Sequence, residues 1–223
     1  MIGVPRVHWR LTDSTIERAK ALAEKGAPHG TLVTADEQSA GRGRQGRAWT
    51  APPRSAVLMS LVVRDPREVL PLIAAVAICE ALPVECAIKW PNDVWLGRRK
   101  LAGILVEGRP QQGWAVLGVG LNVRGTEFPE ELRESAVSLQ QAGIDTDVET
   151  TLGMLLPSLD RWLRAPQRAV LAAWRERDAI RGESVRWASG EGIAAGIDDS
   201  GALLVDTGGT RIVLQAGEVH LLR

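Results

Sequence analysis

The sequence predicts an α+β protein, with a mixed, mainly antiparallel central sheet, flanking helices and a small C-terminal β-barrel. Segments with the apolar period of a helix alternate with short apolar runs typical of buried strands. In the middle of the chain, strand-length segments follow one another with tight turns, which indicates antiparallel pairing. Beyond residue 180 the pattern changes to short strands separated by Gly-rich turns. We therefore expect two domains, at 1–180 and 181–223.

The composition is that of an ordinary folded protein. The 223 residues include 27 Lys plus Arg and 27 Asp plus Glu, so the formal net charge is zero. This balance argues against a nucleic-acid binder with a global basic field and against a polybasic membrane anchor. The N-terminus lacks the apolar segment of a signal peptide, and two cysteines, Cys79 and Cys86, are too few for a disulfide scaffold. We expect a cytoplasmic protein that binds neither nucleic acid nor membranes, with both cysteines as packing residues.

The start of the chain contains one predicted helix and two predicted strands. A helix is expected over 14–25, because Ser14 and Glu17 have the spacing of a capping box and apolar residues line one face. Short apolar runs predict strands at 31–35 and 56–63. The segment between these two strands has no apolar period and is expected to be a long loop, which in a compact domain is usually functional.

This loop contains the motif GRGRQGR at 41–47, and no acidic residue occurs between Gln38 and Arg64. Its arginines, with one that follows, are Arg42, Arg44, Arg47 and Arg54. Glycines let backbone N–H groups approach an anion, and arginine matches carboxylate or phosphate in bidentate fashion. The spacing is not that of a P-loop. The motif alone indicates either an anion site or a flexible basic loop that binds RNA.

The middle of the chain combines one helix with a run of strands. A helix is predicted over 66–82, with Pro66 at its start and Pro83 just beyond its end. Four strands joined by turns are predicted at 87–90, 94–96, 100–108 and 114–123. Because the turns are short, we expect these strands to be neighbours in one sheet.

The last part of the chain is predicted to contain two helices and the small β-barrel. The helices are expected over 129–135 and 149–178. The five short strands that follow are predicted at 184–188, 192–197, 202–206, 211–215 and 218–222. We expect these strands to form the C-terminal domain.

Polar residues and glycines interrupt the middle strands at three places. KWPND at 89–93 places a lysine, an amide and a carboxylate at one turn, which fits a plain hairpin but also phosphate, base-stacking and Mg²⁺ chemistry. RKLAGILVE at 99–107 opens with a lysine that belongs either to a pocket rim or to a solvated strand end. GVGLNV at 118–123 has two glycines that leave room for a ligand or another backbone, and an amide that needs a hydrogen-bond partner.

Together, GRGRQGR, KWPND, RKLAGILVE and GVGLNV, preceded by DST at 13–15, resemble the biotin protein ligase family, or biotin–[acetyl-CoA-carboxylase] ligases. The resemblance covers essentially the whole chain, including the C-terminal β module. It implies a class II synthetase-like biotin/lipoate ligase domain followed by an SH3-like β-barrel. The DNA-binding domain of repressor-type relatives has no counterpart here, so the monofunctional class is expected.

The resemblance implies a two-step, AMP-forming reaction. Biotin is activated with ATP to biotinyl-5′-AMP, and biotin is then transferred to a specific lysine of the biotin carboxyl carrier protein of acetyl-CoA carboxylase. The implied small molecules are biotin and ATP, with Mg²⁺ as the ion and no prosthetic group. A homodimer is an assembly that the resemblance allows.

The resemblance also implies roles for individual residues. Lys100, Arg42 and Arg44 are the implied catalytic residues, which clamp the biotin carboxylate and the α-phosphate by charge. The implied biotin contacts are Ser14, Thr15, Gln38, Gly41, Arg42, Gly43, Arg44, Lys100 and Gly103. The implied ATP contacts are Arg44, Arg47, Trp49, Lys89, Asn92, Asn122 and Arg223. Asp93 is the candidate Mg²⁺ ligand.

One residue departs from the family pattern, and alternative functions stay open. Ile16 stands where the family usually has Asn, which removes one amide beside Ser14 and Thr15. The alternatives are a ligase for lipoate or another acyl group, a non-catalytic biotin sensor, and an RNA-binding protein that uses the basic loop. The neutral overall charge disfavours the RNA-binding protein.

Overall fold

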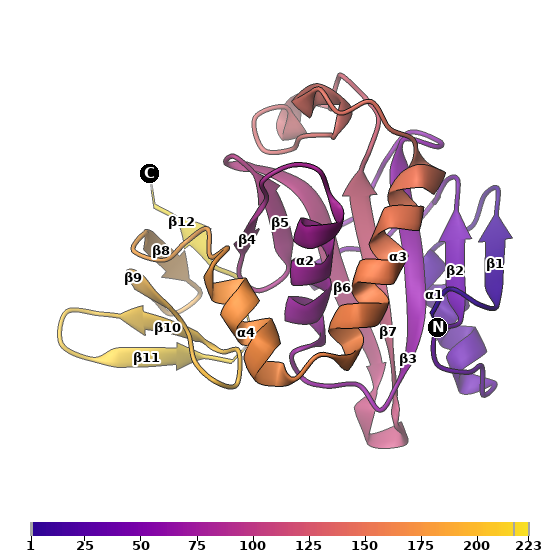
Figure 1. The fold of residues 1–223 in the computed structure, drawn as a ribbon. Helices are drawn as coiled ribbons and strands as arrows, with labels where there is room; N and C mark the ends of the chain where they lie inside the picture. Colours follow the sequence, from indigo (N-terminus) through magenta and orange to yellow (C-terminus); the bar gives the residue numbers. More distant parts are fainter. Residues whose placement is uncertain (1, 216, 223) are drawn as a thin grey trace.

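The computed structural model describes residues 2–215 and 217–222, which form two β-sheets with four α-helices (Figure 1). The strands of the first sheet are β1 (Arg6–Trp9), β2 (Leu32–Ala35), β3 (Ala56–Arg64), β4 (Ala87–Lys89), β5 (Asp93–Leu96), β6 (Arg99–Arg109) and β7 (Trp114–Asn122). Their order in space is β1-β2-β3-β7-β6-β5-β4. Only β1 and β2 pair in parallel among these neighbours. The predicted mixed, mainly antiparallel central sheet is confirmed.

Helices cover both faces of this sheet. They are α1 (Thr15–Glu24), α2 (Leu70–Ala81), α3 (Val148–Arg164) and α4 (Gln167–Arg175). Helices α2, α3 and α4 pack on one face, in front of the sheet in Figure 1, whereas α1 packs against β2, β3 and β7 on the other. Side chains of β3 alternate between the faces, so Met59 and Leu61 join the main core under α2 while Val62 packs with Ile16 of α1. None of the described helices is both long and apolar enough to span a membrane.

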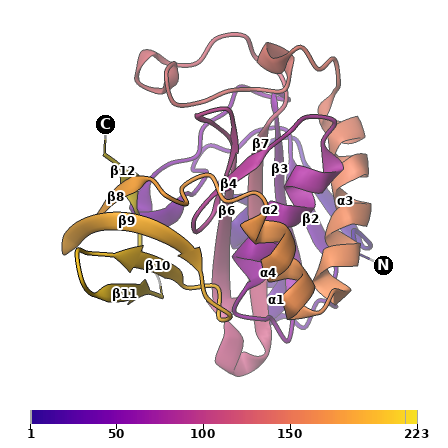
Figure 2. The ribbon, with the colours of Figure 1, turned by 60° about the vertical axis from the view of Figure 1, so that its left-hand side comes forward.

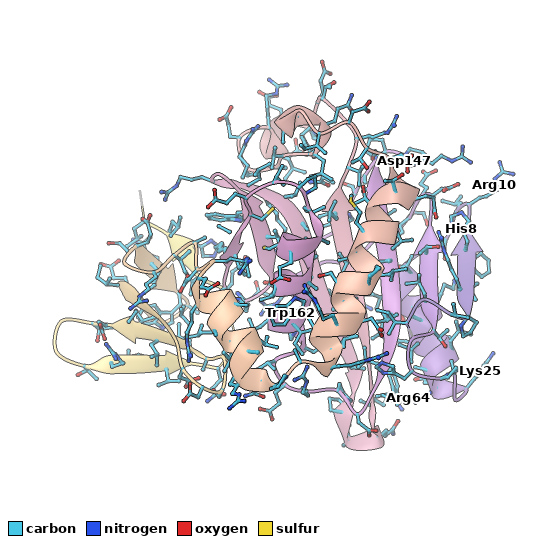
Figure 3. All side chains as sticks on the ribbon, viewed as in Figure 1. His8, Arg10, Lys25, Arg64, Asp147 and Trp162 are labelled. Carbon is cyan, nitrogen blue, oxygen red and sulfur yellow. The ribbon has the colours of Figure 1, made fainter. Side chains whose placement is uncertain are left out.

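Two predicted helices have different bounds in the structure. Helix α2 begins at Leu70, with a proline in its first turn, so Pro66, the predicted start, lies outside it. The helix predicted over 149–178 is two helices, because Ala165 is extended (ψ 147°) before Pro166. A residue before proline is pushed out of the helical conformation. Asp147, labelled at one end of α3 in Figure 3, caps that helix by accepting a hydrogen bond from Thr150 N.

Two other local predictions differ from the structure, and one strand was not predicted. The helix predicted over 129–135 is reduced to a 3₁₀ turn at Glu130–Leu132. Strand β1 was not predicted, because its four residues, RVHW, alternate polar and apolar side chains over too short a run to mark a strand, and they are mostly exposed. Ser14 is the N-cap residue of α1, but its side chain makes no capping hydrogen bond, so the capping-box prediction is wrong. The Ser14 hydroxyl is therefore available for another partner.

The C-terminal module is a five-stranded antiparallel sheet that lies beside α4 and contacts the β4 end of the first sheet. Its strands are β8 (Ser184–Trp187), β9 (Gly190–Ile197), β10 (Leu203–Asp206), β11 (Arg211–Leu214) and β12 (His220–Leu221), in the order β11-β10-β9-β8-β12. Figure 2 shows this sheet beside α4. Ile88 of β4 exchanges main-chain hydrogen bonds with Arg177 and Ala179, and Trp90 Nε1 donates to Gly201 O at 3.0 Å. The five predicted strands are confirmed, with shifted ends.

Candidate functional site

A cavity of about 380 Å³ lies beside α1 and the edge of the C-terminal sheet. It brings together predicted site residues from all four motifs: Ser14, Thr15, Gln38, Arg42, Gly43, Arg44, Arg47, Trp49, Lys89, Asn92, Asp93, Lys100, Gly103 and Asn122. Gly41 does not line the cavity but lies beside residues that do, because an added Cβ would stand 2.2 Å from Trp49 O and 2.8 Å from Gln38 Nε2. Arg223 lies outside the described residues. The fold therefore joins segments that are far apart in the chain.

Hydroxyl and amide groups gather at one side of the cavity. Thr15 donates two hydrogen bonds to Gln38 Oε1, from its N at 2.7 Å and its Oγ1 at 3.0 Å. Ser60 of β3 is fully buried and donates to Thr15 Oγ1 at 2.9 Å. The Oγ of Ser14 is buried and has no hydrogen-bond partner within residues 2–215 and 217–222. Since an unsatisfied buried hydroxyl is costly, Ser14 is suited to bind a polar ligand group.

The basic loop is held by carboxylates that the sequence did not indicate. Arg42 forms ion pairs with Glu17 of α1 and with Glu107 of β6, the second at 2.9 Å. Lys20 contacts the same two carboxylates at 3.1 and 3.2 Å. The guanidinium of Arg42 is thus already paired, although its side chain is 44% exposed. A ligand carboxylate that uses this guanidinium must compete with Glu17 and Glu107.

The other two arginines of the motif contact the C-terminal module. Arg44 donates to Asn92 Oδ1 at 2.8 Å and to Gly217 O at 2.9 Å. Arg47 forms a 2.6 Å ion pair with Glu218. Burial lowers the pKa of the Arg44 guanidinium, but arginine stays charged at any physiological pH. The module therefore supplies part of the cavity wall, with Glu218 and His220 lining it.

Lys100 and Asp93 face each other across the paired strands β5 and β6. Lys100 Nζ lies 2.8 Å from Asp93 Oδ1 and 5.7 Å from the centroid of the Trp49 ring. The exposed fractions of the two charged side chains are 33% and 18%. KWPND forms the expected hairpin turn between β4 and β5, and Lys100 lies at the start of β6. The lysine and the carboxylate of Asp93 also both line the cavity.

The glycines of the strand motifs make room for side chains. A Cβ added at Gly120 would lie 2.3 Å from Cε2 of Trp49, and one at Gly103 would lie 2.9 Å from Cζ3 of the same ring. A Cβ added at Gly118 would lie 2.5 Å from Cδ1 of Ile16. The sequence pattern predicted close approach at the glycines of GVGLNV, but the neighbours found there are Trp49 and Ile16. Ile16 is 4% exposed and belongs to the apolar cluster under α1.

Lys89 and Asn122 have different environments within the cavity. Burial lowers the pKa of the Lys89 ammonium, which lies 5.5 Å from the centroid of the Trp95 ring. Asn122 Nδ2 donates to Val137 O at 3.1 Å, so this amide fixes the neighbouring segment. That segment adds lining residues without a recognisable sequence signal: Phe128, Leu132, Ser135 and Ala136.

Two family models match the chain. Residues 9–123 match the biotin/lipoate A/B protein ligase family, and residues 182–222 match the biotin protein ligase C-terminal domain. The chain belongs to the biotin/lipoate A/B protein ligase family. The biotin–[acetyl-CoA-carboxylase] ligase of Mycobacterium tuberculosis is 39% identical, over 95% of this chain and 87% of its own. The ligase of the same name from Paracoccus denitrificans is 37% identical, over 93% of this chain and 97% of its own.

A solved structure of the same family has the same fold. The structure of biotin protein ligase from Aquifex aeolicus in complex with biotin and ATP has a TM-score of 0.87 to this chain and is 28% identical in sequence. The match covers 98% of both chains, so it includes the C-terminal sheet as well as the central one. The predicted family and fold class are confirmed.

The two cysteines of this ligase-family chain lie away from the cavity and are buried. A hydrogen bond with Cys86 and burial both raise the pKa of the Cys79 thiol. A thiol whose pKa is raised has little thiolate, which is the nucleophilic form. The same hydrogen bond lowers the pKa of the Cys86 thiol. The burial of both side chains agrees with the predicted packing role.

Among the described residues, Asp93 and Glu218 are the carboxylates that line this cavity of the ligase-family chain, and Asp93 is the predicted Mg²⁺ ligand. Within the described part of the chain, no three His, Cys, Asp or Glu side chains are grouped to hold a metal. Mg²⁺ at nucleotide sites needs only one or two carboxylates, because phosphate oxygens and water complete its shell. Asp93 Oδ1 is buried and lies beside Lys100 Nζ, so this carboxylate fits an ion that arrives with a nucleotide.

Proposed function

We propose that this chain is a biotin–[acetyl-CoA-carboxylase] ligase, which activates biotin with ATP and transfers it to a lysine of a biotin carboxyl carrier protein. The observation that carries the proposal is the convergence of four separate motifs on one cavity. The names of the two relatives described above, and the biotin and ATP in the Aquifex aeolicus structure, support the same activity.

The first step joins two anions. A carboxylate oxygen of biotin attacks the α-phosphorus of ATP, a new O–P bond forms, and the bond to the pyrophosphate leaving group breaks. Because both partners are negative, the site must supply positive charge in a partly dry environment. Lys100, Arg42 and Arg44 are the residues proposed to hold the carboxylate and the phosphoryl group in line, without a covalent enzyme intermediate.

The second step needs access for a partner protein. The uncharged amine of the carrier lysine attacks the carbonyl carbon of biotinyl-5′-AMP, an amide bond forms, and AMP leaves with the electron pair of the broken C–O bond. The carrier protein is the proposed partner, and the cytoplasm is the location where we expect the reaction. Neither a homodimer nor nucleic-acid binding is needed for these steps.

The proposed contacts divide between the two ligands. Biotin would contact Ser14, Thr15, Gln38, Gly41, Arg42, Gly43, Arg44, Lys100 and Gly103. ATP would contact Arg44, Arg47, Trp49, Lys89, Asn92, Asn122 and Arg223. Hydroxyl and amide groups suit the ureido ring, which offers two donors and one acceptor. The partly buried Lys89 would pair with the phosphate charge, and Asn122 would act by fixing the segment at Val137.

Asp93 is the residue proposed to hold Mg²⁺. The ion, when bound, supplies charge neutralisation on the phosphate oxygens. Asp93 contributes a carboxylate whose Oδ1 is buried beside Lys100, and the lysine would keep this carboxylate oriented toward the cavity.

Isotope exchange between pyrophosphate and ATP tests the first step. Exchange that depends on biotin, and that neither lipoate nor octanoate supports, is the expected result. Exchange with lipoate or octanoate instead would favour the acyl-ligase alternative. Tight biotin binding without exchange, and without biotin on a carrier domain in a streptavidin blot, would favour the biotin sensor.

A further inference from the structure

Ser60 is a polar residue in the middle of an otherwise apolar strand. Strand β3 has the sequence AVLMSLVVR, and Ser60 within it is 0% exposed. It pairs with Val33 on one side and with Gly118 on the other, and its hydroxyl points to α1, where it meets Thr15. A hydroxyl buried in a core is costly unless it is hydrogen-bonded. The burial of Ser60 therefore depends on its hydrogen bond to Thr15.

The direction of each hydrogen bond in this chain of contacts follows from one backbone amide. The N–H of Thr15 can only donate, so the Gln38 atom 2.7 Å away must be the amide oxygen. The hydroxyl of Thr15 lies 3.0 Å from the same oxygen and must therefore donate to it as well. Its lone pairs then accept from Ser60 at 2.9 Å. The Ser60–Thr15–Gln38 relay thus has one allowed direction.

This direction decides what Gln38 offers to a ligand. Both hydrogen bonds from Thr15 go to Oε1, so the Nε2 group remains for the cavity, which Gln38 lines. An NH₂ group only donates, and its natural partner is a carbonyl oxygen. Ser14, next in the chain to Thr15, adds a buried hydroxyl without a partner among the described residues.

We propose that Ser60 is a positioning residue for recognition of the biotin ring, because it holds Thr15 and, through it, the Gln38 amide with its NH₂ toward the ureido carbonyl oxygen. This inference rests on the proposed function and extends it to a strand outside the four motifs. It also predicts specificity. A ring with a donor in place of the carbonyl, such as the guanidinium ring of 2-iminobiotin, meets a donor at Gln38 and binds poorly.

The first test measures biotin affinity by calorimetry, without ATP. Ser60→Ala is expected to weaken biotin binding about five- to tenfold, which is the loss of one positioning hydrogen bond. Ser60→Cys, which keeps a weak donor of similar size, is expected to restore part of the affinity. The matched control is Ser158→Ala, which removes a buried hydroxyl that donates to Ala77 O at 2.9 Å, in the α2–α3 interface.

Two results of this test would overturn the proposal. One is an unchanged biotin affinity in Ser60→Ala, and the other is an equal loss in Ser60→Ala and Ser158→Ala, which marks a merely structural effect. The KM for ATP in pyrophosphate exchange is expected to change less than about twofold. If Ser60→Ala does not fold, Thr15→Val breaks the same relay from α1, and its biotin affinity must fall by at least as much.

The second test inverts the polarity of Gln38. Gln38→Glu keeps an oxygen for Thr15 and places a second oxygen where the NH₂ was, so the ratio of biotin to 2-iminobiotin affinity is expected to fall at least tenfold. An unchanged ratio would overturn the assignment. A wild-type protein that binds biotin but catalyses no exchange contradicts the ligase and leaves this ratio measurable. A protein that does not bind biotin contradicts both.

Discussion

The indole ring of Trp49 lies directly over Gly120, where an added Cβ would stand 2.3 Å from Cε2. Gly103 lies beneath the same ring and is the register partner of Gly120 across β6 and β7. Two glycines on adjacent strands therefore form the floor on which Trp49 rests. The position of Trp49, a proposed ATP contact, therefore depends on the absence of a Cβ at both glycines.

Gly120→Ala is expected to displace Trp49 and to raise the KM for ATP about tenfold, with a smaller change in the KM for biotin. The reason is that the added methyl group would overlap the ring, and because the paired strands hold the backbone in place, the ring must move. Tryptophan fluorescence would report the displacement. Gly153→Ala is the matched control, because nothing lies within 4 Å of its added Cβ. A wild-type KM for ATP in Gly120→Ala would show that Trp49 does not hold the nucleotide.

Lys100→Ala is expected to lower the rate of adenylate formation at least about 100-fold while leaving the melting temperature nearly unchanged. Its side chain is 33% exposed and its ammonium contacts Asp93, so its removal deletes charge from the cavity without opening the core. Lys25, which projects away from α1 in Figure 3, provides the control variant Lys25→Ala. Pyrophosphate exchange measures the effect. Exchange at the wild-type rate in Lys100→Ala would contradict the clamping role.

The ion pairs of Arg42 are expected to order the basic loop before any ligand binds. Replacing both partners, Glu17→Gln with Glu107→Gln, should speed tryptic cleavage at the loop arginines several-fold, because cleavage needs local opening. Glu149→Gln breaks an ion pair with Arg6 outside this loop and serves as control. Mass spectrometry of the first fragments locates the cut. Equal cleavage rates in the double variant and the control would show that the ion pairs of Arg42 do not order the loop.

Lys89→Met is expected to stabilise the fold by about 2–4 °C in Tm while raising the KM for ATP. Burial lowers the pKa of Lys89 in the folded state, so at neutral pH folding carries the cost of a desolvated charge. This cost disappears as pH rises from the lowered pKa to the ordinary lysine value, where both states are neutral. The Tm advantage of the variant should therefore shrink between neutral pH and pH above the ordinary value. A Tm difference between Lys89→Met and the wild-type protein that stays constant across this pH range would show that the stabilisation does not come from removal of the charge.

The sequence predicted the elements and site residues that depend on local patterns. Motif residues such as Lys100 and Asp93 were found because their types and order are informative along the chain. Glu17 and Glu107 were missed as partners of Arg42, because they approach it only after α1 and β6 pack together. A solvated carboxylate and a pairing one look the same in a sequence.

Other omissions have separate physical causes. Strand β1 was not predicted, because a four-residue alternation at an exposed sheet edge is too short to be told from chance. Ser60 did carry a signal, since a lone hydroxyl in an apolar strand requires a partner. Its partner could be named only when Thr15 was seen facing it. Helix ends were misplaced where Pro166 broke a continuous apolar period.

The hydrogen bond from Arg44 to Gly217 ends on a main-chain oxygen. Side chains of the C-terminal sheet can therefore diverge between related proteins without removing the acceptor. Gly217 itself is an exception, because its φ of 123° is strained for other residues. Insertions or deletions just before Gly217 would move the oxygen and break this contact between the two modules. Random point mutagenesis of the C-terminal sheet should thus leave this connection intact far more often than changes in length.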